Sequence, residues 1–269
     1  MESSMQVWAV FYHPTLFTED LYQRALKVID TLDPEAATRI RRFYRREDAC
    51  RTLIGHLLRR LMLHELGIDP SVIRFSTTES GKPYIASPEL NPPLGFNITH
   101  DNSLIALAFS RNQNPPTRSI GIDIMKLHIP GKESFPSFVH TVGDQLTPHE
   151  HHLIFSGSST EEKLQTFFWM WTMKEAYTKA LGLGLGFDFK RVEFDAQSRI
   201  LRVDGETPIG WSFKMFELKD NEDTYEGVVA EFLGNGKTEV VHENDTHEWL
   251  KRYDAVSFVE NVIERFGMQ

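Results

Sequence analysis

The sequence predicts an α+β fold of two lobes, and two observations support this prediction. The chain of 269 residues is 41% apolar and 12% aromatic, which is enough for one large or two smaller packed domains. In both halves of the chain, segments with helical periodicity come before segments typical of strands. The second set of helices begins after Lys126, so we expect an N-terminal α+β lobe over residues 1–125 and a C-terminal α+β lobe over residues 126–269. No period or self-similar block is found in the residues themselves.

The first half is expected to begin with a buried strand over residues 7–12, where the sequence reads VWAVFY. Thr18 is a good N-cap for a helix over 18–29, because Glu19 and Asp20 follow in its first turn. The other segments predicted in this half are helices at 34–43 and 47–66, the second ended by Gly67; strands at 73–76 and 83–86; a hairpin of strands at 96–100 and 104–109; a loop at 111–118; and a strand at 120–125.

In the second half, Thr147 and Pro148 are a typical N-cap and first residue for a helix over 148–155. A helix over 167–181, which reads FFWMWTMKEAYTKAL, follows and ends at Gly182. The other segments predicted here are a helix at 134–142; strands at 189–195, 199–203, 211–218 and 225–233; and a final amphipathic helix at 246–266.

The helix over 167–181 is apolar on nearly every face, so it should be buried. Glu175 and Lys179 lie one turn apart on the face of Phe168 and Trp171. At a surface this spacing forms a favourable ion pair worth about 0.2–0.5 kcal/mol. In apolar surroundings, a carboxylate and an ammonium are costly unless they are paired or used by a ligand. This segment alone therefore leaves two interpretations open, a structural ion pair and a functional site.

The composition points to a reducing compartment. Cys50 is the single cysteine, so an intramolecular disulfide is excluded. No N-terminal segment has the parts of a signal peptide, and no apolar run approaches the roughly 20 residues needed to span a bilayer. We therefore expect a soluble, cytoplasmic protein.

The net charge of −9 argues against a general nucleic-acid binder. The charges are unevenly distributed, because residues 39–60 contain eight arginines but only two acidic residues, Glu47 and Asp48. Such a cluster is either a solvated helical face or a surface for a polyanionic small ligand or an acidic partner.

The predicted strand IGIDIM at 120–125 carries an acidic residue inside an apolar run. With a period of two, its three isoleucines face one side, whereas Gly121, Asp123 and Met125 face the other. An aspartate in such a strand needs a partner, and the glycine beside it leaves room for something large to approach the backbone. A structural hydrogen-bond acceptor is the simplest interpretation, and a functional carboxylate is the alternative.

A second polar face is predicted on the strand over 96–100. Asn97 and Thr99 share one face of this strand, and His100 and Asp101 follow at the turn. These residues form either a polar hairpin edge or a phosphate or metal site built from side chains at the end of a strand.

Three other segments have possible functional meanings. Gly81-Lys82-Pro83 offers an exposed cation on a tight turn. The run HEHH at 149–152 lacks the spacing of the HExxH zinc motif, so a surface location is expected. The sequence GLGLG at 182–186 follows a helix rather than joining a strand to one, so it is neither a Rossmann nor a P-loop fingerprint.

Taken in order, four of these segments resemble the consensus blocks of the phosphopantetheinyl transferase superfamily, which are GKP, FN(I/V)SH, (I/V)G(I/V)D and W(S/T/A)xKE(A/S)xxK. The blocks occur here at 81–83, 96–100, 120–123 and 171–179, and the arginine-rich RFYRREDACR precedes them. The ordered set is specific, although no single block is decisive. The chain is similar to the large, pseudo-dimeric type that modifies surfactin synthetase, and GIDIMKLHIPG and KALGLGLGF resemble its broad-range eukaryotic and fungal members.

The resemblance implies a fold and a reaction. The fold is two similar lobes, each with a small antiparallel sheet and packed helices, related by a pseudo-two-fold axis, with coenzyme A in the cleft between them. The reaction is transfer of the 4′-phosphopantetheine arm of coenzyme A to a serine of an apo acyl, peptidyl or aminoadipate-reductase carrier domain, with Mg²⁺ and with release of adenosine 3′,5′-bisphosphate. A monomer is expected. The alternatives are a non-catalytic protein that binds coenzyme A or carrier domains, and a metal-dependent phosphohydrolase.

The resemblance also implies roles for individual residues. By position, Asp123 and Glu175 match the metal carboxylates, and Glu175 is the candidate base for the carrier serine. Lys179 matches the residue that meets the pyrophosphate and completes the expected catalytic set. The residues expected to bind coenzyme A are Arg39, Gly81, Lys82, Pro83, Asn97, Thr99, His100 and Lys179, with His100 and Lys82 at the ribose 3′-phosphate.

Two positions depart from the family pattern. Many bacterial relatives have a third metal carboxylate where this chain has Met125, a methionine that eukaryotic relatives share. Thr99 replaces the usual serine and keeps the hydroxyl. We expect Asp101 to supply the missing metal ligand, directly or through water. Because carrier domains are generally acidic, we also expect part of the arginine-rich stretch, Arg45 and Arg46 included, to face them.

Overall fold

Two four-stranded sheets form the centre of the protein, and the computed structural model describes residues 5–111, 120–129, 131, 133–244 and 248–267. The strand order is β12 (Leu250–Asp254), β1 (Gln6–Phe11), β5 (Leu104–Ser110) and β4 (Gly95–Asp101) in the first sheet, and β11 (Glu239–His242), β9 (Trp211–Asp220), β10 (Asp223–Phe232) and β6 (Ile120–Lys126) in the second. Neighbouring strands are antiparallel, except that the edge strands β12 and β11 run parallel to β1 and β9.

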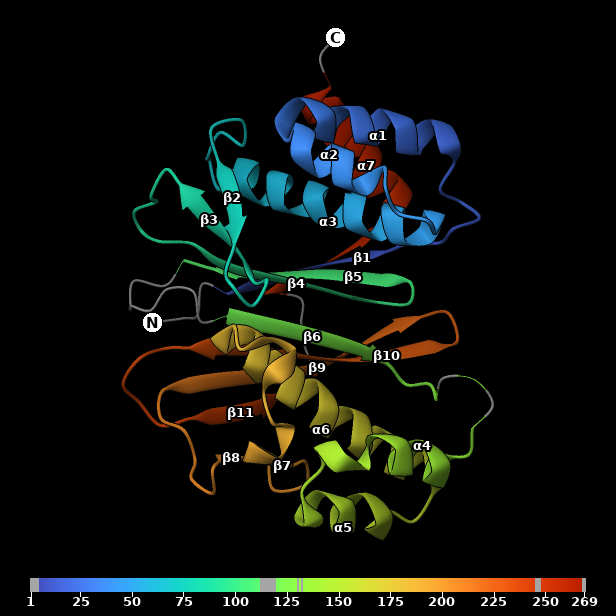
Figure 1. Ribbon diagram of the computed structural model, residues 1–269, viewed down its shortest axis with the longest axis vertical. Helices are drawn as coiled ribbons and strands as arrows, with labels where there is room; N and C mark the ends of the chain where they lie inside the picture. The colour runs from blue at the N-terminus through green and yellow to red at the C-terminus, as the bar shows by residue number, and fades with distance from the viewer. Residues whose placement is uncertain (1–4, 112–119, 130, 132, 245–247, 268–269) are drawn as a thin grey trace.

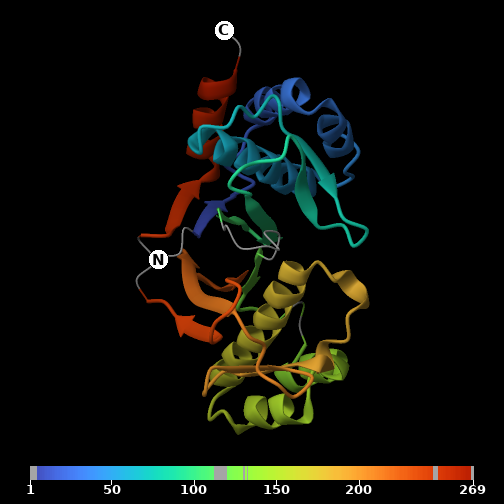
Figure 2. The ribbon, with the colours of Figure 1, turned by 90° about the vertical axis from the view of Figure 1, so that its left-hand side faces the viewer.

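Helices cover the outer faces of the two sheets, as Figures 1 and 2 show. The first lobe contains α1 (Glu19–Leu32), α2 (Pro34–Ile40), α3 (Arg46–Glu65) and α7 (Ala255–Phe266), and the second contains α4 (Phe135–Val142), α5 (Pro148–Ser156) and α6 (Thr160–Leu181). A two-stranded hairpin accompanies each sheet, β2 (Arg74–Thr77) with β3 (Pro83–Ser87) and β7 (Val192–Asp195) with β8 (Ile200–Val203). Short 3₁₀ turns occur at Gly143–Gln145, Gly184–Gly186 and Phe189–Arg191. Among the described helices, none combines the length and the apolar character needed to cross a membrane.

The order of elements is the same in both lobes. A first strand, β1 or β6, leads into three helices, then into a small hairpin, and then into two long strands, the second of which returns to pair with the first strand. The two lobes are therefore topological copies, which confirms the predicted α+β fold of two similar lobes. The copies differ in the parallel edge strand, which lies beside β1 in the first sheet but beside β9 in the second.

The sheets pack against each other with their inner faces. One apolar cluster lies under the helices of each lobe, and a third lies between the sheets, where it includes Ala9 and Ala108 of the first sheet and Ile122 and Val229 of the second. Ile122 therefore faces the other sheet, while Gly121 on the opposite face of β6 lies against α6. This arrangement confirms the two faces that the alternation in 120–125 predicts.

The division of the chain between the two sheets differs from the lobe boundary expected near Lys126. Strand β6, which that boundary assigns to the N-terminal lobe, pairs with β10 in the second sheet. Strand β12 and helix α7, at the other end of the chain, return to the first lobe, where β12 pairs with β1. Pairing between strands this far apart in the sequence does not affect the local periodicity, so the sequence pattern does not predict it.

The prediction of a final helix over 246–266 is wrong at its start. Residues 250–254 form β12, and the helix begins only at Ala255. Asp254 is the N-cap, because its carboxylate accepts hydrogen bonds from the amides of Val256 and Ser257. Residues 246 and 247 of the predicted helix and residues 112–118 of the predicted loop lie outside the described residues. Strand β11 had no predicted counterpart.

A close approach between backbones holds α6 on β6. A Cβ atom added at Gly121 would lie 2.1 Å from the carbonyl oxygen of Ala176 and 2.3 Å from the amide nitrogen of Ala180. Only glycine on β6 and small residues on α6 allow this approach. The contact brings the helix that carries Glu175 and Lys179 against the strand that carries Asp123.

We expect Gly121→Ala to lower the free energy of unfolding by about 3 kcal/mol, because the new methyl group must push α6 away from β6. Urea denaturation measures this loss. Gly55→Ala is the matched control, since the nearest atom to a Cβ there is 3.7 Å away and alanine is favoured in a helix by about 0.5–1 kcal/mol. Equal stability of the two variants would contradict the close approach.

Glu226 is a fully buried carboxyl group on β10, opposite Met125 of β6 and Glu217 of β9. Neither of its carboxyl oxygens has a hydrogen-bond partner in the described part of the chain, since the nearby Gln165 amide donates to Glu217 instead. Burial, with the charge of Glu217, raises the pKa of Glu226 well above 4.5. The folded protein thus keeps a proton here that the unfolded chain releases.

We expect Glu226→Gln to raise the melting temperature more at pH 8 than at pH 5. Between the unfolded pKa of 4.5 and the raised folded pKa, folding takes up a proton, so this group makes the native protein less stable as the pH rises. Glutamine removes the cost. A shift in melting temperature that is the same at both pH values would show that Glu226 is not protonated on folding.

Candidate active site

A hydrogen-bonded group of three side chains joins the two lobes. Lys179 of α6 donates from Nζ to Asp123 Oδ1 of β6 at 2.6 Å and to Thr99 Oγ1 of β4 at 3.2 Å. The Thr99 hydroxyl in turn donates to Asp123 Oδ1 at 3.1 Å. Asn97, two residues earlier on β4, accepts from the amide of Ile122 at 2.9 Å. Asn97 and Thr99 therefore tie β4 of the first sheet to β6 of the second, and Lys179 ties α6 to both.

Two carboxyl groups, those of Asp123 and Glu175, lie near the Lys179 ammonium. Asp123 is 3% exposed, and its Oδ2 is buried with no hydrogen-bond partner among the described residues. Burial raises the pKa of Asp123, although Lys179 opposes the shift. Burial, followed by the charge of Asp123, also raises the pKa of Glu175. Burial alone would lower the pKa of Lys179, but Asp123 and Glu175 outweigh it and raise that pKa.

These groups fit a divalent cation that is also held by a ligand. No cluster of three His, Cys, Asp or Glu side chains able to hold a metal occurs in the ranges that the structure describes. Mg²⁺ commonly takes only one or two protein carboxylates, with phosphate and water completing its octahedron. The unpartnered oxygen of Asp123 and the carboxyl group of Glu175 are the donors suited to this role.

Asp101 lies at the end of β4, and its Oδ2 accepts a hydrogen bond from the amide of Lys126 at 2.7 Å. Its carboxylate therefore links the ends of β4 and β6, and together with Asp123 and Glu175 it does not form a preformed metal cluster. The assignment of Asp101 as a metal ligand stays a prediction.

His100 is exposed on β4 next to this group. Partial loss of hydration, with the positive charges of Arg51 and Lys179, lowers the pKa of its imidazole. The free ring is therefore neutral near pH 7, and an anion bound beside it would favour the protonated form.

The Gly81-Lys82-Pro83 turn differs from the expected exposed cation. Gly81 has a positive φ of 86° that suits glycine, and Pro83 opens β3. Lys82 is half-buried, and its Nζ donates to the carbonyl oxygens of Ala180 at 2.6 Å and Ile120 at 3.0 Å. The turn therefore lies against α6 and β6.

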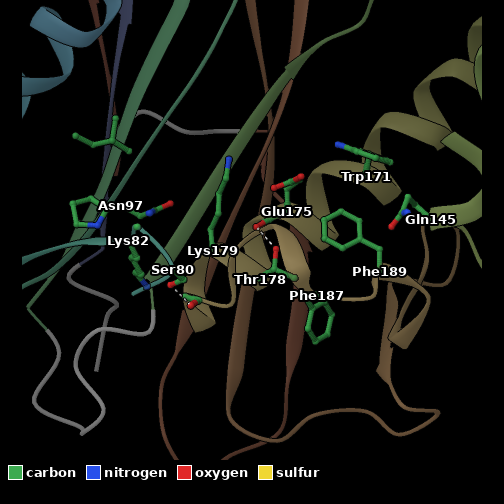
Figure 3. Close-up of a pocket in the computed structure, with 15 residues that line it drawn as sticks. Ser80, Lys82, Asn97, Gln145, Trp171, Glu175, Thr178, Lys179, Phe187 and Phe189 are labelled. Atoms are coloured by element: carbon green, nitrogen blue, oxygen red, sulfur yellow. Dashed lines mark hydrogen bonds between the residues drawn. The ribbon is translucent and has the colours of Figure 1, made fainter. Parts of the chain in front are cut away.

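A cavity of about 470 Å³ lies between the lobes beside these groups. Figure 3 shows Asn97, Lys82 and Lys179 on one side of it and the aromatic Trp171 and Phe189 on the other, with Glu175 between. A second cavity of about 310 Å³ lies beyond Lys82 and has an apolar lining that includes Tyr84, Phe96 and Leu181. A third, of about 420 Å³, is largely aromatic and includes Asp101, Met125, Phe138, Phe168 and Trp171 in its lining.

The arginine-rich stretch divides into structural and exposed members. Arg60 is buried and binds the carbonyl oxygens of Pro70 and Ile73. Arg46 pairs with Glu19 at 2.7 Å and stacks over Tyr22, so it is not a free docking charge.

Arg39 is exposed on α2 and lies outside the lining of the three cavities, but its positive charge acts on His56 and Arg59 of α3. The buried Arg59 lies over Phe75, with an Nη atom 2.6 Å from His56 Nδ1. Its Nε has no hydrogen-bond partner among the residues that the structure describes. Burial lowers its pKa to about 10. His56 and Arg59 lie three residues apart and so share one face of a helix, and this spacing is the feature of the sequence that could have identified them as neighbours.

The side chains of the run at 149–152 have different partners. Glu150 is fully buried and binds Lys174 at 2.7 Å, whereas His149 and His152 are exposed. The prediction of a surface location is therefore right for these two histidines and wrong for Glu150.

Lys174 is a buried residue with several hydrogen-bond partners, and the sequence pattern did not identify it. Besides Glu150, its Nζ donates to the carbonyl oxygens of Gln145 and Phe189, each at 3.0 Å, and both of these residues line the 470 Å³ cavity. Glu150 also accepts from the amides of Thr147 and Phe194. Burial lowers the pKa of Lys174, opposed by Glu150. One ion pair thus fixes the aromatic wall of the cavity.

Comparison with known sequences gives a consistent family. The model of the 4′-phosphopantetheinyl transferase superfamily matches residues 119–230, and that of the N-terminal part of 4′-phosphopantetheinyl transferases matches 19–112. The 4′-phosphopantetheinyl transferase pptA of Paxillus involutus is 45% identical over 97% of this chain and 99% of its own. The L-aminoadipate-semialdehyde dehydrogenase-phosphopantetheinyl transferase of Homo sapiens is 31% identical over 87% of this chain and 78% of its own. The 4′-phosphopantetheinyl transferase of Bacillus subtilis is 32% identical over 68% and 76%.

We expect Lys174→Met to lower the free energy of unfolding by about 3–5 kcal/mol, because it leaves the Glu150 carboxylate buried without a counter-charge. The double variant Lys174→Met/Glu150→Gln should recover much of this loss, since glutamine can keep the capping hydrogen bond. Urea denaturation measures both. Arg191→Gln, which breaks an exposed ion pair with Asp204, is the control and should cost less than about 1 kcal/mol. Equal losses in the single and double variants would rule out this explanation.

Proposed function

Because this chain belongs to the 4′-phosphopantetheinyl transferase superfamily, we propose that it carries out the family's reaction at Asp123, Glu175 and Lys179 in the cavity between its lobes. It transfers the 4′-phosphopantetheine arm of coenzyme A to a serine of an apo carrier domain. The new bond joins the serine oxygen to the phosphorus next to pantetheine. The bond that breaks joins this phosphorus to the bridging oxygen, which leaves with adenosine 3′,5′-bisphosphate.

The single observation that best supports this assignment is the Asp123–Thr99–Lys179 group, which places an ammonium and an unpartnered carboxylate oxygen at the junction of the two lobes. Lys179 can turn from Asp123 Oδ1 to the diphosphate of coenzyme A without leaving the site. Its raised pKa keeps it charged, so it can stabilise the negative charge that develops on the bridging oxygen.

We propose that Asp123 and Glu175 hold Mg²⁺, because the Oδ2 of Asp123, unpartnered within the described residues, and the carboxyl group of Glu175 are oxygen donors that suit this ion. Bound there, the ion would neutralise charge on the diphosphate and activate its phosphorus for attack. Whether Asp101 joins them, directly or through water, stays a prediction.

Glu175 is the proposed general base. It lines the cavity, where its carboxylate can reach the hydroxyl of a carrier serine. It would take the proton of the carrier serine, directly or through one water, as the serine oxygen attacks. The wall that Lys174 fixes would align the two substrates, which lowers the entropic part of the barrier.

The anionic ends of coenzyme A are proposed to meet the cations of the first lobe. His100 is poised to gain a proton when a phosphate binds beside it. The exposed Arg39 on α2 offers a further positive charge. Gly81, Pro83, Asn97 and Thr99 keep their proposed place in the coenzyme site, and Asn97 and the Gly81–Pro83 turn line the 470 Å³ cavity.

Acyl, peptidyl and aminoadipate-reductase carrier domains are the proposed partners, the last because the mammalian relatives are named for L-aminoadipate-semialdehyde dehydrogenase. The aromatic cavity beside Met125 suits an apolar side chain next to the carrier serine. The exposed Arg45 suits an acidic carrier surface, whereas Arg46 is already paired. Because the two lobes of one chain supply both sides of the site, a second copy is not needed, and we propose a monomer that acts in the cytoplasm.

We expect native protein with coenzyme A and Mg²⁺ to add the mass of one phosphopantetheine arm to apo carriers, as measured by mass spectrometry of a carrier panel. Glu175→Gln should lower kcat by about 10²–10⁴-fold, because it removes the base and a metal ligand. Glu161→Gln, on an exposed position of the same helix, is the matched control.

Two outcomes would contradict this function. Binding of coenzyme A with no mass increase on any apo carrier would indicate a non-catalytic binding protein. Release of adenosine 3′,5′-bisphosphate without a carrier would indicate a phosphohydrolase.

A further inference from the structure

The turn of the β2–β3 hairpin, residues 78–82, is held rigid by its own hydrogen bonds. The amide of Thr78 donates to the carbonyl of Lys82 at 2.9 Å, and the amide of Lys82 donates back to the Thr78 hydroxyl at 3.1 Å. The hydroxyls of Thr78 and Ser80 lie 2.8 Å apart. The hairpin turn therefore presents Ser80 and Lys82 in a fixed arrangement.

Both side chains reach the C-terminal end of α6 in the other lobe. Lys82 Nζ donates to Ala180 O at 2.6 Å, and the Ser80 hydroxyl donates to Gly182 O. The last carbonyls of a helix have no partner within the helix and carry its negative dipole end, so an ammonium is favourable there. Gly184 lies close as well, since a Cβ there would be 3.2 Å from Ser80 Cβ.

The same ammonium also holds the start of β6, because Lys82 Nζ donates to Ile120 O at 3.0 Å. Ala180 directly follows Lys179, and Ile120 lies three residues before Asp123. Lys82 therefore fixes the two backbone segments whose separation decides how Lys179 meets Asp123. It lines both the 470 Å³ and the 310 Å³ cavities, so it also separates them.

We propose that Lys82 is a positioning residue, which latches the hairpin turn of the first lobe onto α6 and β6 and thereby aligns Lys179 with Asp123. This inference rests on the proposed function and changes the part expected of Lys82. In this role the Lys82 ammonium contributes mainly through its hydrogen bonds to the carbonyl oxygens of Ala180 and Ile120, and not mainly through contact with the ribose 3′-phosphate.

Coenzyme A and dephospho-coenzyme A, which lacks the 3′-phosphate, separate the two roles. We expect Lys82→Met to lower kcat by the same factor with both donors, on the order of 10- to 100-fold, because a displaced Lys179 is misaligned whichever donor is bound. Ser80→Ala should cause a smaller loss, again equal for both donors. Glu79→Gln is the matched control, since Glu79 is an exposed residue of the same turn.

A loss confined to the KM for coenzyme A, and absent with dephospho-coenzyme A, would overturn the latch and restore Lys82 as a phosphate cation. Hydrogen exchange gives an independent readout. The amides of Gly182 and Leu183, which bond to the carbonyls of Lys179 and Thr178, should exchange faster in Lys82→Met than in Glu79→Gln. Unchanged exchange would also overturn the latch. If native protein transfers nothing to any carrier, the proposed function fails, but the exchange experiment still tests the latch. If Lys82→Met does not fold, Ser80→Ala replaces it in the exchange experiment.

Discussion

The close approach of α6 to β6 at Gly121 is the constraint on which the rest of the site depends. Backbone atoms of Ala176 and Ala180 occupy the space that any side chain at Gly121 would need. This contact puts the helix in register with the strand, so that Lys179 reaches Asp123 at 2.6 Å. A buried ion pair is seldom stabilising by itself, because two charges must lose their water. Here the apolar packing of α6 supplies the stability, and the charges remain available for chemistry.

The charge balance of the site follows from this geometry. Asp123 and Glu175 both lie near Lys179, so two carboxyl groups share this neighbouring ammonium, and burial is the main cause that raises the pKa values of both acids. A polyanionic substrate would add negative charge to the site. A divalent cation bound with the substrate would offset this charge, and Mg²⁺ commonly takes only one or two protein carboxylates.

The two lobes supply different parts of the site. The first lobe presents β4 and the hairpin turn, whose Thr99 and Lys82 contact the second lobe through side-chain hydrogen bonds. The second lobe presents β6 and α6, which carry the carboxylates and Lys179, and it braces its aromatic wall with the Lys174–Glu150 pair. The cavity lies between them because the two sheets pack through their inner faces and leave the edges β4 and β6 side by side.

The sequence by itself determined the local features of helices and strands and which polar side chains are able to take part in chemistry. The caps Thr18 and Thr147, the alternation around Asp123 and the one-turn spacing of Glu175 and Lys179 depend on short-range geometry, and each appears as predicted. The tertiary structure alone decided which partners these residues have. Parallel pairing of β12 with β1, burial of Lys174 against Glu150, and the bond from Lys82 to Ala180 join residues distant in sequence. The energies of such contacts depend on burial and direction in space, which no local pattern of residues encodes.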